Sequence, residues 1–521
     1  MFYTMSERTK KIWRTIKPIL VFAVLIWWGA MILFLIKRNK APDPIIIPDI
    51  NIVEIGEMLS EDYYSITFCG EKIGFSNLIV RRLLTGGLMY QESSFYRLPV
   101  GGVEHEITSL SLLAVDDSLR TRIVNFEFKA DNYETIVNAV VSDGTLSVSV
   151  ESGGDAFSRK YPLENPIYST AVLPKLLANR YFTPSQSELN TFDPLTMSEA
   201  KYDIYILGED RLDRFGSQAV YVVRITYGQI SSHLFIEPSG KLLMETTQEG
   251  FMSVLEEKEI ALSLDVREGG SNDLLEEFAI PLGMGVIKRP RDAVKLVLNI
   301  VDLVPGIFEL DDFNQRWDEN NGILTIISEG LDSVDEIYGP DSSDTTETQT
   351  IQCNDRRIIN AALKITKDAE TDLDKLVAIN GYLFEEMKKD YTLSIPSAVE
   401  VLKKMRGDCN EHSILFVALA RSIGIPARIN VGLLYLNGDF YYHAWPQAFA
   451  NGRWFTFDPT LGQFPADASH VKLTSGGLDE YLALLRMGNA RLRLVSVTYS
   501  DGETYKTGET GENFGEEDDA K

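Results

Sequence analysis

The sequence predicts an α+β protein with an N-terminal transmembrane helix, a large antiparallel β domain and a C-terminal α+β domain. Three observations predict this division: an uncharged apolar run, a long stretch of alternating strand patterns, and helix patterns followed by hairpin signals. The expected parts are a cytoplasmic N-terminus (1–17), a transmembrane anchor (18–36), a linker (37–59), an antiparallel β domain (60–275), a connecting β region and linker (276–350), an α+β domain (351–498) and an acidic disordered tail (499–521).

The composition excludes several classes of protein. Of the 521 residues, 44% are hydrophobic and 24% are charged. This is the balance of a folded globular chain, not of a disordered or multi-pass membrane protein. The 50 Lys and Arg residues against 76 Asp and Glu residues give a net charge of −26. A surface this acidic repels phosphate backbones, so we expect no nucleic-acid partner.

The cysteine and histidine content predicts neither a disulfide scaffold nor a metal site. The chain has three cysteines, Cys69, Cys353 and Cys409, and this odd number leaves at least one thiol free. No CxxC pair and no HExxH sequence occurs, and the five histidines are scattered. We therefore expect no bound metal and no cofactor.

The run PILVFAVLIWWGAMILFLI at 18–36 predicts a membrane anchor. As a helix it would span about 28 Å, close to the hydrocarbon thickness of a bilayer. A cleaved signal peptide is the alternative, but Lys37, Arg38 and Lys40 follow the run, not small residues. Five basic residues before the run and three after it favour a cytoplasmic N-terminus. We therefore expect a single-pass protein of the inner (cytoplasmic) membrane with a periplasmic or otherwise extracytoplasmic body.

The region from 63 to 264 alternates apolar and polar residues and is rich in Val, Ile, Tyr and Thr. This pattern predicts a large, strongly curved antiparallel sheet. The region contains no cluster of nucleophile, base and acid, so we interpret it as a structural or binding sheet. The rhythm from 202 to 261 resembles the half-barrel sheets of bacterial envelope proteins that carry or sense lipoproteins. An envelope protein or a lipid is therefore an expected partner of this domain.

Beyond this region, the patterns VKLVLNI and GILTIIS predict two strands, and two helices are expected near 355–366 and 371–388. A third helix begins at Gly407-Asp408, because the turn and the carboxylate suit a helix start and EHSILFVALARSIG continues as a buried helix. Cys409 then lies in the first turn, where unpaired N–H groups and the helix dipole lower the pKa of a thiol. This makes Cys409 a candidate nucleophile, although free cysteine is commonly a small buried hydrophobe.

Two Asn-Gly pairs predict the hairpins that follow, because Asn-Gly favours a two-residue turn. With a turn at 451–452, Ala450 pairs with Arg453, and His443 would lie opposite Thr460. Asp458 would then be a diagonal neighbour of His443 on the same face, within side-chain reach. A turn at 437–438 places Gly432 opposite His443 and leaves space beside the imidazole. Nucleophile, base and orienting acid would together form a cysteine triad.

The segments GDCNEHSILFVALARSIGIPARINVGLLY, YYHAWPQAF and NGRWFTFDPT resemble the transglutaminase-like superfamily, a branch of papain-like cysteine enzymes. The resemblance covers about 120 residues, from 354 to 473, and suggests a membrane-anchored bacterial type. It implies a transglutaminase-like (papain-like) α+β domain. It further implies that Cys409 is the nucleophile, His443 the general base and Asp458 the orienting acid. Backbone N–H groups near Cys409 are the expected oxyanion hole.

Two other histidines compete with this assignment. His412 lies three residues after Cys409 and could touch the thiol, but it lacks an obvious orienting acid. His470 could line the cleft, although it is equally explained as a polar residue of a loop. We therefore leave both outside the expected catalytic set.

The expected activity is acyl transfer from a peptide or carboxamide bond through a thioester on Cys409. Hydrolysis, as in a protease or amidase, is favoured over cross-linking by an acyltransferase, and the anchor suggests envelope proteins or peptides as substrates. A catalytically silent membrane-tethered binding or assembly module is the alternative, because about 200 residues of sheet carry no catalytic group.

Overall fold

The structure, a computed structural model, describes residues 55–507 apart from 101, 131–132, 153–154, 180–185, 195–197, 228–229, 249, 264–277, 304–305, 307, 309, 329–338, 392–396, 477–486 and 488–489. The predicted cytoplasmic N-terminus (1–17), the predicted transmembrane helix (18–36) and most of the predicted linker (37–59) lie outside the described residues. The predicted acidic tail lies outside them from 508 onward. Among the described helices, none is both long and apolar enough to cross a membrane.

The predicted α+β class is wrong, because 54% of the described residues lie in strands and 18% in helices. The protein is mostly β, and an N-terminal transmembrane helix is not shown by the structure. Within the described chain, helices longer than seven residues occur only between 356 and 422. Strands lie both before and after this segment, and the last two are β25 (Arg491–Tyr499) and β26 (Thr504–Lys506). More described residues therefore lie in strands than in the helices on which the predicted class was based.

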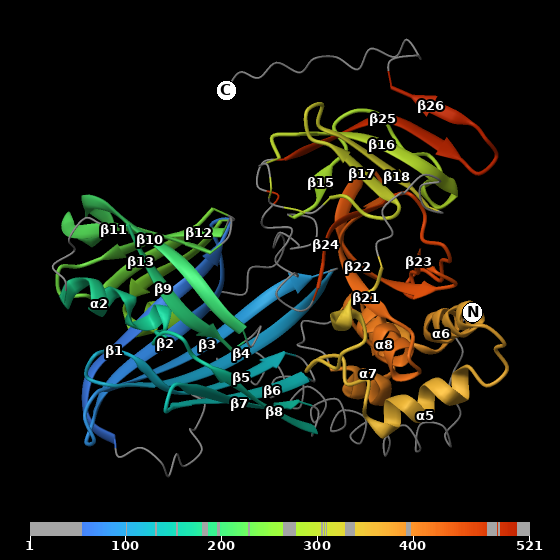
Figure 1. The fold of residues 1–521 in the computed structure, drawn as a ribbon. Helices are drawn as coiled ribbons and strands as arrows, with labels where there is room; N and C mark the ends of the chain where they lie inside the picture. Colours follow the sequence, from blue (N-terminus) through green and yellow to red (C-terminus); the bar gives the residue numbers. More distant parts are fainter. Residues whose placement is uncertain are drawn as a thin grey trace, which may run out of the picture.

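The first part of the described chain forms one antiparallel sheet of 14 strands, called the large sheet, which is strongly curved in Figure 1. Two meanders join where β1 pairs with β14. The first contains β1 (Ile55–Phe68), β2 (Glu71–Leu83), β3 (Leu88–Val100), β4 (Val103–Val115), β5 (Thr121–Ala130), β6 (Tyr133–Ser142), β7 (Thr145–Ser152) and β8 (Asp155–Pro162). The second contains β9 (Gln186–Asp193), β10 (Ser198–Leu212), β11 (Gln218–Tyr227), β12 (Ile230–Ile236), β13 (Leu242–Thr247) and β14 (Phe251–Glu256).

A connecting segment with η1 (Thr170–Val172) and α2 (Leu173–Asn179) links the two meanders. The N–H group of Thr121 in β5 donates to the carbonyl of Ile167, and the N–H group of Tyr168 donates to the carbonyl of Asn190 in β9. Ile167 and Val172 are fully buried in a hydrophobic cluster with residues of the first meander. Burial of this apolar surface, together with the two hydrogen bonds, holds the segment against both halves of the large sheet.

The C-terminal part combines helices with two smaller sheets, as Figure 1 shows. The helices of its described residues are α5 (Arg356–Ile365), α6 (Asp372–Glu386), α7 (Ala398–Lys404) and α8 (Cys409–Ser422). One sheet has the order β15-β22-β21-β24, with β23 paired to β22. The other has the order β17-β18-β16-β25-β26. Their remaining strands are β15 (Ile280–Pro281), β16 (Ala293–Val301), β17 (Gln315–Asp318), β18 (Ile323–Ile327), β21 (Ala427–Leu436), β22 (Asp439–Ala450), β23 (Arg453–Thr456) and β24 (His470–Ser475).

The remaining short elements complete the described chain. They are η2 (Asp213–Phe215), α3 (Lys258–Leu262), η3 (Pro290–Asp292), η4 (Ser342–Asp344), β19 (Lys388–Lys389) and β20 (Arg406–Gly407). Several sequence predictions are confirmed here. Strands β16 and β18 cover the two expected patterns, and α5 and α6 lie where two helices were expected. Both Asn-Gly turns form, with φ of 55° at Asn437 and 52° at Asn451.

A buried polar network joins the two smaller sheets. The ammonium group of Lys472 in β24 lies 2.5 Å from a carboxylate oxygen of Asp312, which precedes β17. The amide of Gln447 in β22 donates to the same carboxylate at 3.1 Å. Gln315 in β17 donates to the Lys472 carbonyl at 2.8 Å and accepts from its N–H group at 3.0 Å. Because these buried groups satisfy one another, the connecting region is fixed against the sheet that contains β22.

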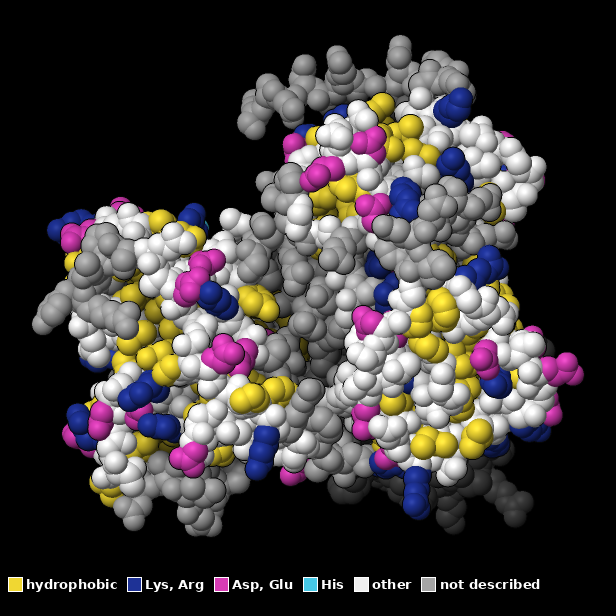
Figure 2. All heavy atoms as spheres, viewed as in Figure 1, with side chains coloured by type: hydrophobic (Ala, Val, Ile, Leu, Met, Phe, Trp, Pro, Cys, Tyr) yellow, Lys and Arg dark blue, Asp and Glu magenta, His cyan; other side chains and the backbone are white. Residues whose placement is uncertain are grey.

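The large sheet contacts the C-terminal part through helix α7. The hydroxyl of Ser152 in β7 donates to Glu400 at 2.9 Å, and the ammonium group of Lys404 lies 3.3 Å from the ring centroid of Tyr133 in β6. Glu400 is buried and also pairs with Lys404 at 2.7 Å. Figure 2 shows acidic and basic side chains interspersed over the large sheet and the C-terminal part on this face of the molecule.

We predict that Gly432→Ala destabilises the C-terminal part. A Cβ atom at Gly432 would lie 2.0 Å from the carbonyl oxygen of Val471 in the neighbouring strand β24, so the two strands would have to separate. The free energy of unfolding should fall by about 1–3 kcal/mol, the usual cost of overpacking. Urea unfolding followed by tryptophan fluorescence measures this change.

Gly381→Ala is the matched control. Gly381 lies in α6, and a Cβ atom there would meet no atom within 4 Å. Because alanine favours a helix over glycine, this variant should gain about 0.5–1 kcal/mol. Equal stability of the two variants would contradict the close approach of β21 and β24 at Gly432.

Candidate active site

Cys409 is the first residue of α8, as the sequence predicts. Asp408 caps the helix: its side chain accepts from the N–H group of Asn410 at 2.8 Å, and its own N–H group donates to Glu411 at 2.9 Å. This reciprocal arrangement is a capping box, which fixes where a helix begins. It therefore determines the position of the sulfur in the first turn.

The sulfur of Cys409 faces strand β22. The backbone N–H group of Ala444, the residue after His443, donates to it. The hydroxyl of Ser413, one turn further along α8, donates to the Ala444 carbonyl at 3.1 Å. The phenol of Tyr442 donates to Asn410 at 2.9 Å. These contacts hold the start of α8 against the part of β22 that carries His443.

The electrostatic surroundings of Cys409 differ from the expectation. Burial raises the pKa of the Cys409 thiol well above its usual value, and the carboxylates of Asp408, Glu411 and Asp458 raise it further. The N–H group of Ala444 lowers the pKa, but its effect is smaller. The expected lowering by the helix terminus does not prevail, so the resting sulfur is a neutral thiol.

His443 and Asp458 are in direct contact, as predicted. Nε2 of His443 lies 2.9 Å from Oδ2 of Asp458, and both side chains are buried. The predicted pairs Ala450 with Arg453 and Gly432 with His443 are confirmed. The predicted pairing of His443 with Thr460 is wrong, because β23 ends at Thr456 and the chain turns away. The contact therefore forms between strand β22 and the turn that follows β23.

The turn around Asp458 holds its carboxylate in place. Oδ1 accepts the N–H groups of Thr460 at 2.8 Å and Leu461 at 2.9 Å. Burial opposes ionisation, but His443 and His470 outweigh it and hold the pKa of Asp458 well below its usual range. Asp458 is therefore a fully buried carboxylate whose two oxygens both accept hydrogen bonds.

His470 is a residue of this site that sequence reasoning left out. Its Nε2 lies 3.1 Å from the same Oδ2 of Asp458, and its Nδ1 lies 3.0 Å from the carbonyl and 3.3 Å from the carboxylate of Asp467. Burial disfavours the charged imidazole, but Asp467 and Asp458 outweigh burial and raise the pKa of His470 to about 10. His470 is therefore an imidazolium at neutral pH. The signal that could have identified it is Asp467, three residues earlier.

The aromatic rings around Asp458 are packed together. Trp445 is nearly parallel to His443, at 6.1 Å between ring centroids, and lies edge-on to His470 at 5.1 Å.

His412, the other competing histidine, is fully buried, and its Nδ1 bonds the carbonyl of Asp408 at 2.6 Å. Burial lowers the pKa of His412, so the ring is neutral. His412 therefore supports the start of α8.

Metal binding at this cluster has a limited structural basis. His443, Asp458 and His470 each offer one ligand atom, and these atoms lie within 4.8 Å of one another. Yet Oδ2 of Asp458 is at hydrogen-bond distance from both imidazoles. Protons that bridge these atoms account for the geometry without an ion. The absence of a metal stays a prediction.

We predict that the Cys409 thiol is alkylated slowly at neutral pH. Because its pKa is raised, iodoacetamide should label Cys409 more slowly than the exposed Cys69 at pH 7, and the difference should narrow above pH 9. Mass spectrometry of both cysteine peptides from one sample measures the ratio. Faster labelling of Cys409 at pH 6–7 would show a preformed thiolate and contradict the neutral thiol.

We predict that His470→Gln destabilises the fold in a pH-dependent way. The folded pKa of about 10 exceeds the unfolded value of about 6.5. The stabilisation is therefore complete below about pH 6.5 and is lost as pH rises toward 10. Near pH 6 the variant should lose about 3–5 kcal/mol, since breaking a buried pair leaves Asp458 and Asp467 partly uncompensated. Urea unfolding at pH 6–10 measures the difference.

His412→Gln is the control for that measurement. Because burial lowers the pKa of His412, its ring is already neutral above pH 7, and its replacement should leave the slope of stability against pH unchanged there. A constant difference between unmodified protein and His470→Gln from pH 6 to 10 would contradict an imidazolium at 470.

Comparisons with known proteins support the sequence resemblance. A family model described as the transglutaminase-like superfamily matches residues 359–459, which include Cys409, His443 and Asp458. No protein of the curated set matches the chain.

Three solved structures are similar to parts of the chain at low sequence identity. A β-barrel-like protein of unknown function from Brucella abortus is 12% identical, with a TM-score of 0.32 over 39% of this chain and 97% of its own. A candidate cysteine protease from Cytophaga hutchinsonii is 17% identical, with a TM-score of 0.25 over 41% and 81%. A candidate protease from Parabacteroides distasonis is 11% identical, with a TM-score of 0.18 over 72% and 68%. These TM-scores are too low to support conclusions about activity, whereas the family match locates a transglutaminase-like domain at residues 359–459.

Proposed function

We propose that this protein is a cysteine-nucleophile acyl-transfer enzyme that acts on peptide or carboxamide bonds. Cys409 is the nucleophile, His443 the general base and Asp458 the acid that orients His443. The contact of 2.9 Å between Nε2 of His443 and Oδ2 of Asp458 supports this proposal most directly. This contact orients the imidazole of His443. The next residue, Ala444, donates its N–H group to the Cys409 sulfur.

The orientation of His443 defines the proton path. Because Nε2 faces Asp458, Nδ1 is the nitrogen that takes the proton of the Cys409 thiol. The sulfur attacks the carbonyl carbon, and a tetrahedral intermediate forms. Nδ1 then gives the proton to the departing amine as the C–N bond breaks, which leaves a thioester on Cys409. Water or a second amine attacks the thioester and releases the thiol.

A neutral resting thiol fits this sequence of steps. Since the pKa of Cys409 is raised, proton transfer to His443 accompanies the attack and does not precede it. The positive charge that forms on His443 is stabilised by the carboxylate of Asp458, whose low pKa keeps it ionised. The Ala444 N–H group, which bonds the sulfur, is a backbone donor available for negative charge at the reaction centre.

Water is the proposed acceptor, so the favoured reaction is hydrolysis by a protease or amidase, and cross-linking is the second reaction. Envelope proteins or peptides are the proposed substrates. Location at the inner (cytoplasmic) membrane, with the body outside the cytoplasm, stays a prediction from the sequence around 18–36. An envelope protein or lipid as partner of the large sheet likewise stays a prediction.

A catalytically silent binding or assembly module is the second candidate. The raised pKa of Cys409 favours it, because a neutral, half-buried thiol is a weak nucleophile without base assistance. The two candidates differ in a single observable, which is whether a thioester forms on Cys409.

We predict that the full chain releases p-nitrophenolate from p-nitrophenyl acetate with an initial burst, and that the acetyl group appears on the Cys409 peptide. Cys409→Ala and His443→Ala should each lower turnover by at least about 1,000-fold, because nucleophile and base act as a unit. Asp458→Asn should leave a slow residual rate, because the nucleophile and the base both remain while the carboxylate that orients His443 and stabilises its charge is lost. Absorbance and mass spectrometry measure both products.

Cys353→Ala is the matched control, because Cys353 is a buried free thiol far from this chemistry in the chain. It should keep full turnover.

Adding n-butylamine separates the two acceptors: acetate as the main product supports hydrolysis, and N-butylacetamide supports amine transfer. Unchanged turnover in Cys409→Ala, or no acetylated Cys409 peptide, would favour the silent module.

A further inference from the structure

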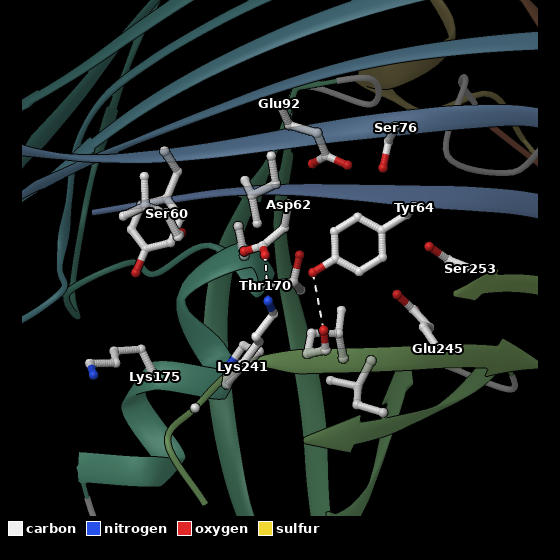
Figure 3. A pocket seen from close by; sticks show the side chains of 18 of the residues that line it. Ser60, Asp62, Tyr64, Ser76, Glu92, Thr170, Lys175, Lys241, Glu245 and Ser253 are labelled. Carbon is white, nitrogen blue, oxygen red and sulfur yellow. Dashed lines mark hydrogen bonds and ion pairs between the residues drawn. The ribbon is translucent and has the colours of Figure 1, made fainter. Parts of the chain in front are cut away.

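The large sheet encloses a cavity of about 620 Å³ that is separate from the cluster at Asp458. Figure 3 shows Glu92 and Tyr64 entering it from the first meander and Glu245 from the second. Helix α2 contributes Lys175 and the preceding turn contributes Thr170. A volume of this size accommodates a small organic molecule.

The cavity wall combines carboxyl groups with aliphatic side chains. Glu92 in β3 pairs with Leu78 in β2, and Glu245 in β13 pairs with Leu234 in β12. All four line the cavity. Since alternate residues of a strand share a face, Leu88, four residues before Glu92, lies on the same side of β3 and also lines the cavity. Each carboxyl group therefore lies beside an apolar surface, and a ligand that fits both would be amphipathic.

Glu92 and Glu245 lack basic partners among the described residues. Burial raises the pKa of Glu92, the charge of Glu245 raises it further, and a hydrogen bond from Ser76 lowers it less. Burial likewise raises the pKa of Glu245, against a smaller lowering by Ser232. Both carboxyl groups therefore tend to hold their protons, because two carboxylates without a basic partner are costly to bury close together.

The other titratable groups that face the cavity do not neutralise this pair. Lys241 pairs with Asp62 in β1 at 2.6 Å, so its charge is matched. The rest of the facing titratable groups are Lys175, Asp193, Tyr64, Tyr90, Tyr202 and Tyr227. Burial raises the pKa of Tyr90 and Tyr202 to about 12 and also raises that of Tyr64, so these phenols stay neutral. The described cavity thus has an excess of acidic groups.

We propose that this cavity binds an organic ammonium ion with an apolar body, held by Glu92 and Glu245. The positive charge of such a ligand stabilises both carboxylates, and no described basic residue pairs with either of them. The tyrosine rings offer electron-rich faces to the same cation, and the leucines cover its apolar part. A fatty-acid carboxylate or a phosphate group would instead oppose the ionisation of both glutamates.

The sign of the pH dependence follows from this arrangement. An ammonium ion favours ionised carboxyl groups, so binding releases protons from Glu92 and Glu245. The affinity therefore rises with pH until both groups are ionised. A neutral ligand that accepts hydrogen bonds from protonated carboxyl groups would show the opposite trend.

The test uses the full chain and n-hexylamine, which is a cation throughout the range studied, with 1-hexanol as its neutral counterpart. Isothermal titration calorimetry at pH 5.5 and pH 8.0 should give at least tenfold tighter binding of hexylammonium at pH 8.0. Buffers of different ionisation enthalpy should reveal proton release. 1-Hexanol should bind at least tenfold more weakly than hexylammonium at pH 8.0.

The double variant Glu92→Gln/Glu245→Gln should lose this binding and its pH dependence, and Glu245→Gln alone should weaken it if the double variant does not fold. Glu188→Gln is the matched control, because Glu188 lies on β9 of the same sheet with its side chain exposed toward Lys201, and it should change nothing. Equal binding of 1-hexanol, weaker binding at pH 8.0, unchanged binding in the variants, or no binding of hexylammonium would each overturn the proposal.

Discussion

The arrangement of the candidate active site depends on one buried carboxylate. Asp458 accepts two backbone N–H groups on one oxygen and two imidazoles on the other. A carboxylate withdrawn from water is costly unless all its acceptor positions are used. Here the turn after β23, strand β22 and strand β24 each supply donors, so the ionised form of Asp458 requires these three segments to be assembled. The chemistry of His443 is thereby coupled to the fold.

The carboxylate of Asp458 has opposite effects on the proposed base, His443, and on the proposed nucleophile, Cys409. It orients His443 and stabilises its charged form, but it also disfavours a thiolate at Cys409. His470 shares Oδ2 of Asp458 with His443. A neutral thiol at Cys409 and an imidazole oriented by Asp458 suit proton transfer during attack better than a stored ion pair.

Local sequence signals predicted the parts of this site that depend on local structure. The Asn-Gly pairs located both turns, because asparagine and glycine tolerate a positive φ. Asp408 and Glu411 located the start of α8 through the capping box. The raised pKa of Cys409 could not be predicted, since its largest cause is burial, which depends on the tertiary packing around α8. His470 was left out of the catalytic set because its contact with Asp458 depends on how the turn after β23 packs against β24. The predicted fold class is wrong because local patterns do not reveal strands that pair over long distances in the chain. Strands β16 and β25, for example, pair although almost 200 residues separate them.

The two sites of the molecule show that burial alone does not decide the state of a carboxyl group. Asp458 is fully buried and ionised because four donors surround it. Glu92 and Glu245 have one serine donor each, and burial raises their pKa values. The number of donors thus separates a carboxylate that the fold itself has satisfied from carboxyl groups that still gain from an external cation. On this reasoning the C-terminal part satisfies its buried carboxylate from within the fold, whereas the cavity of the large sheet is the place where we propose that a bound cation stabilises the carboxyl groups.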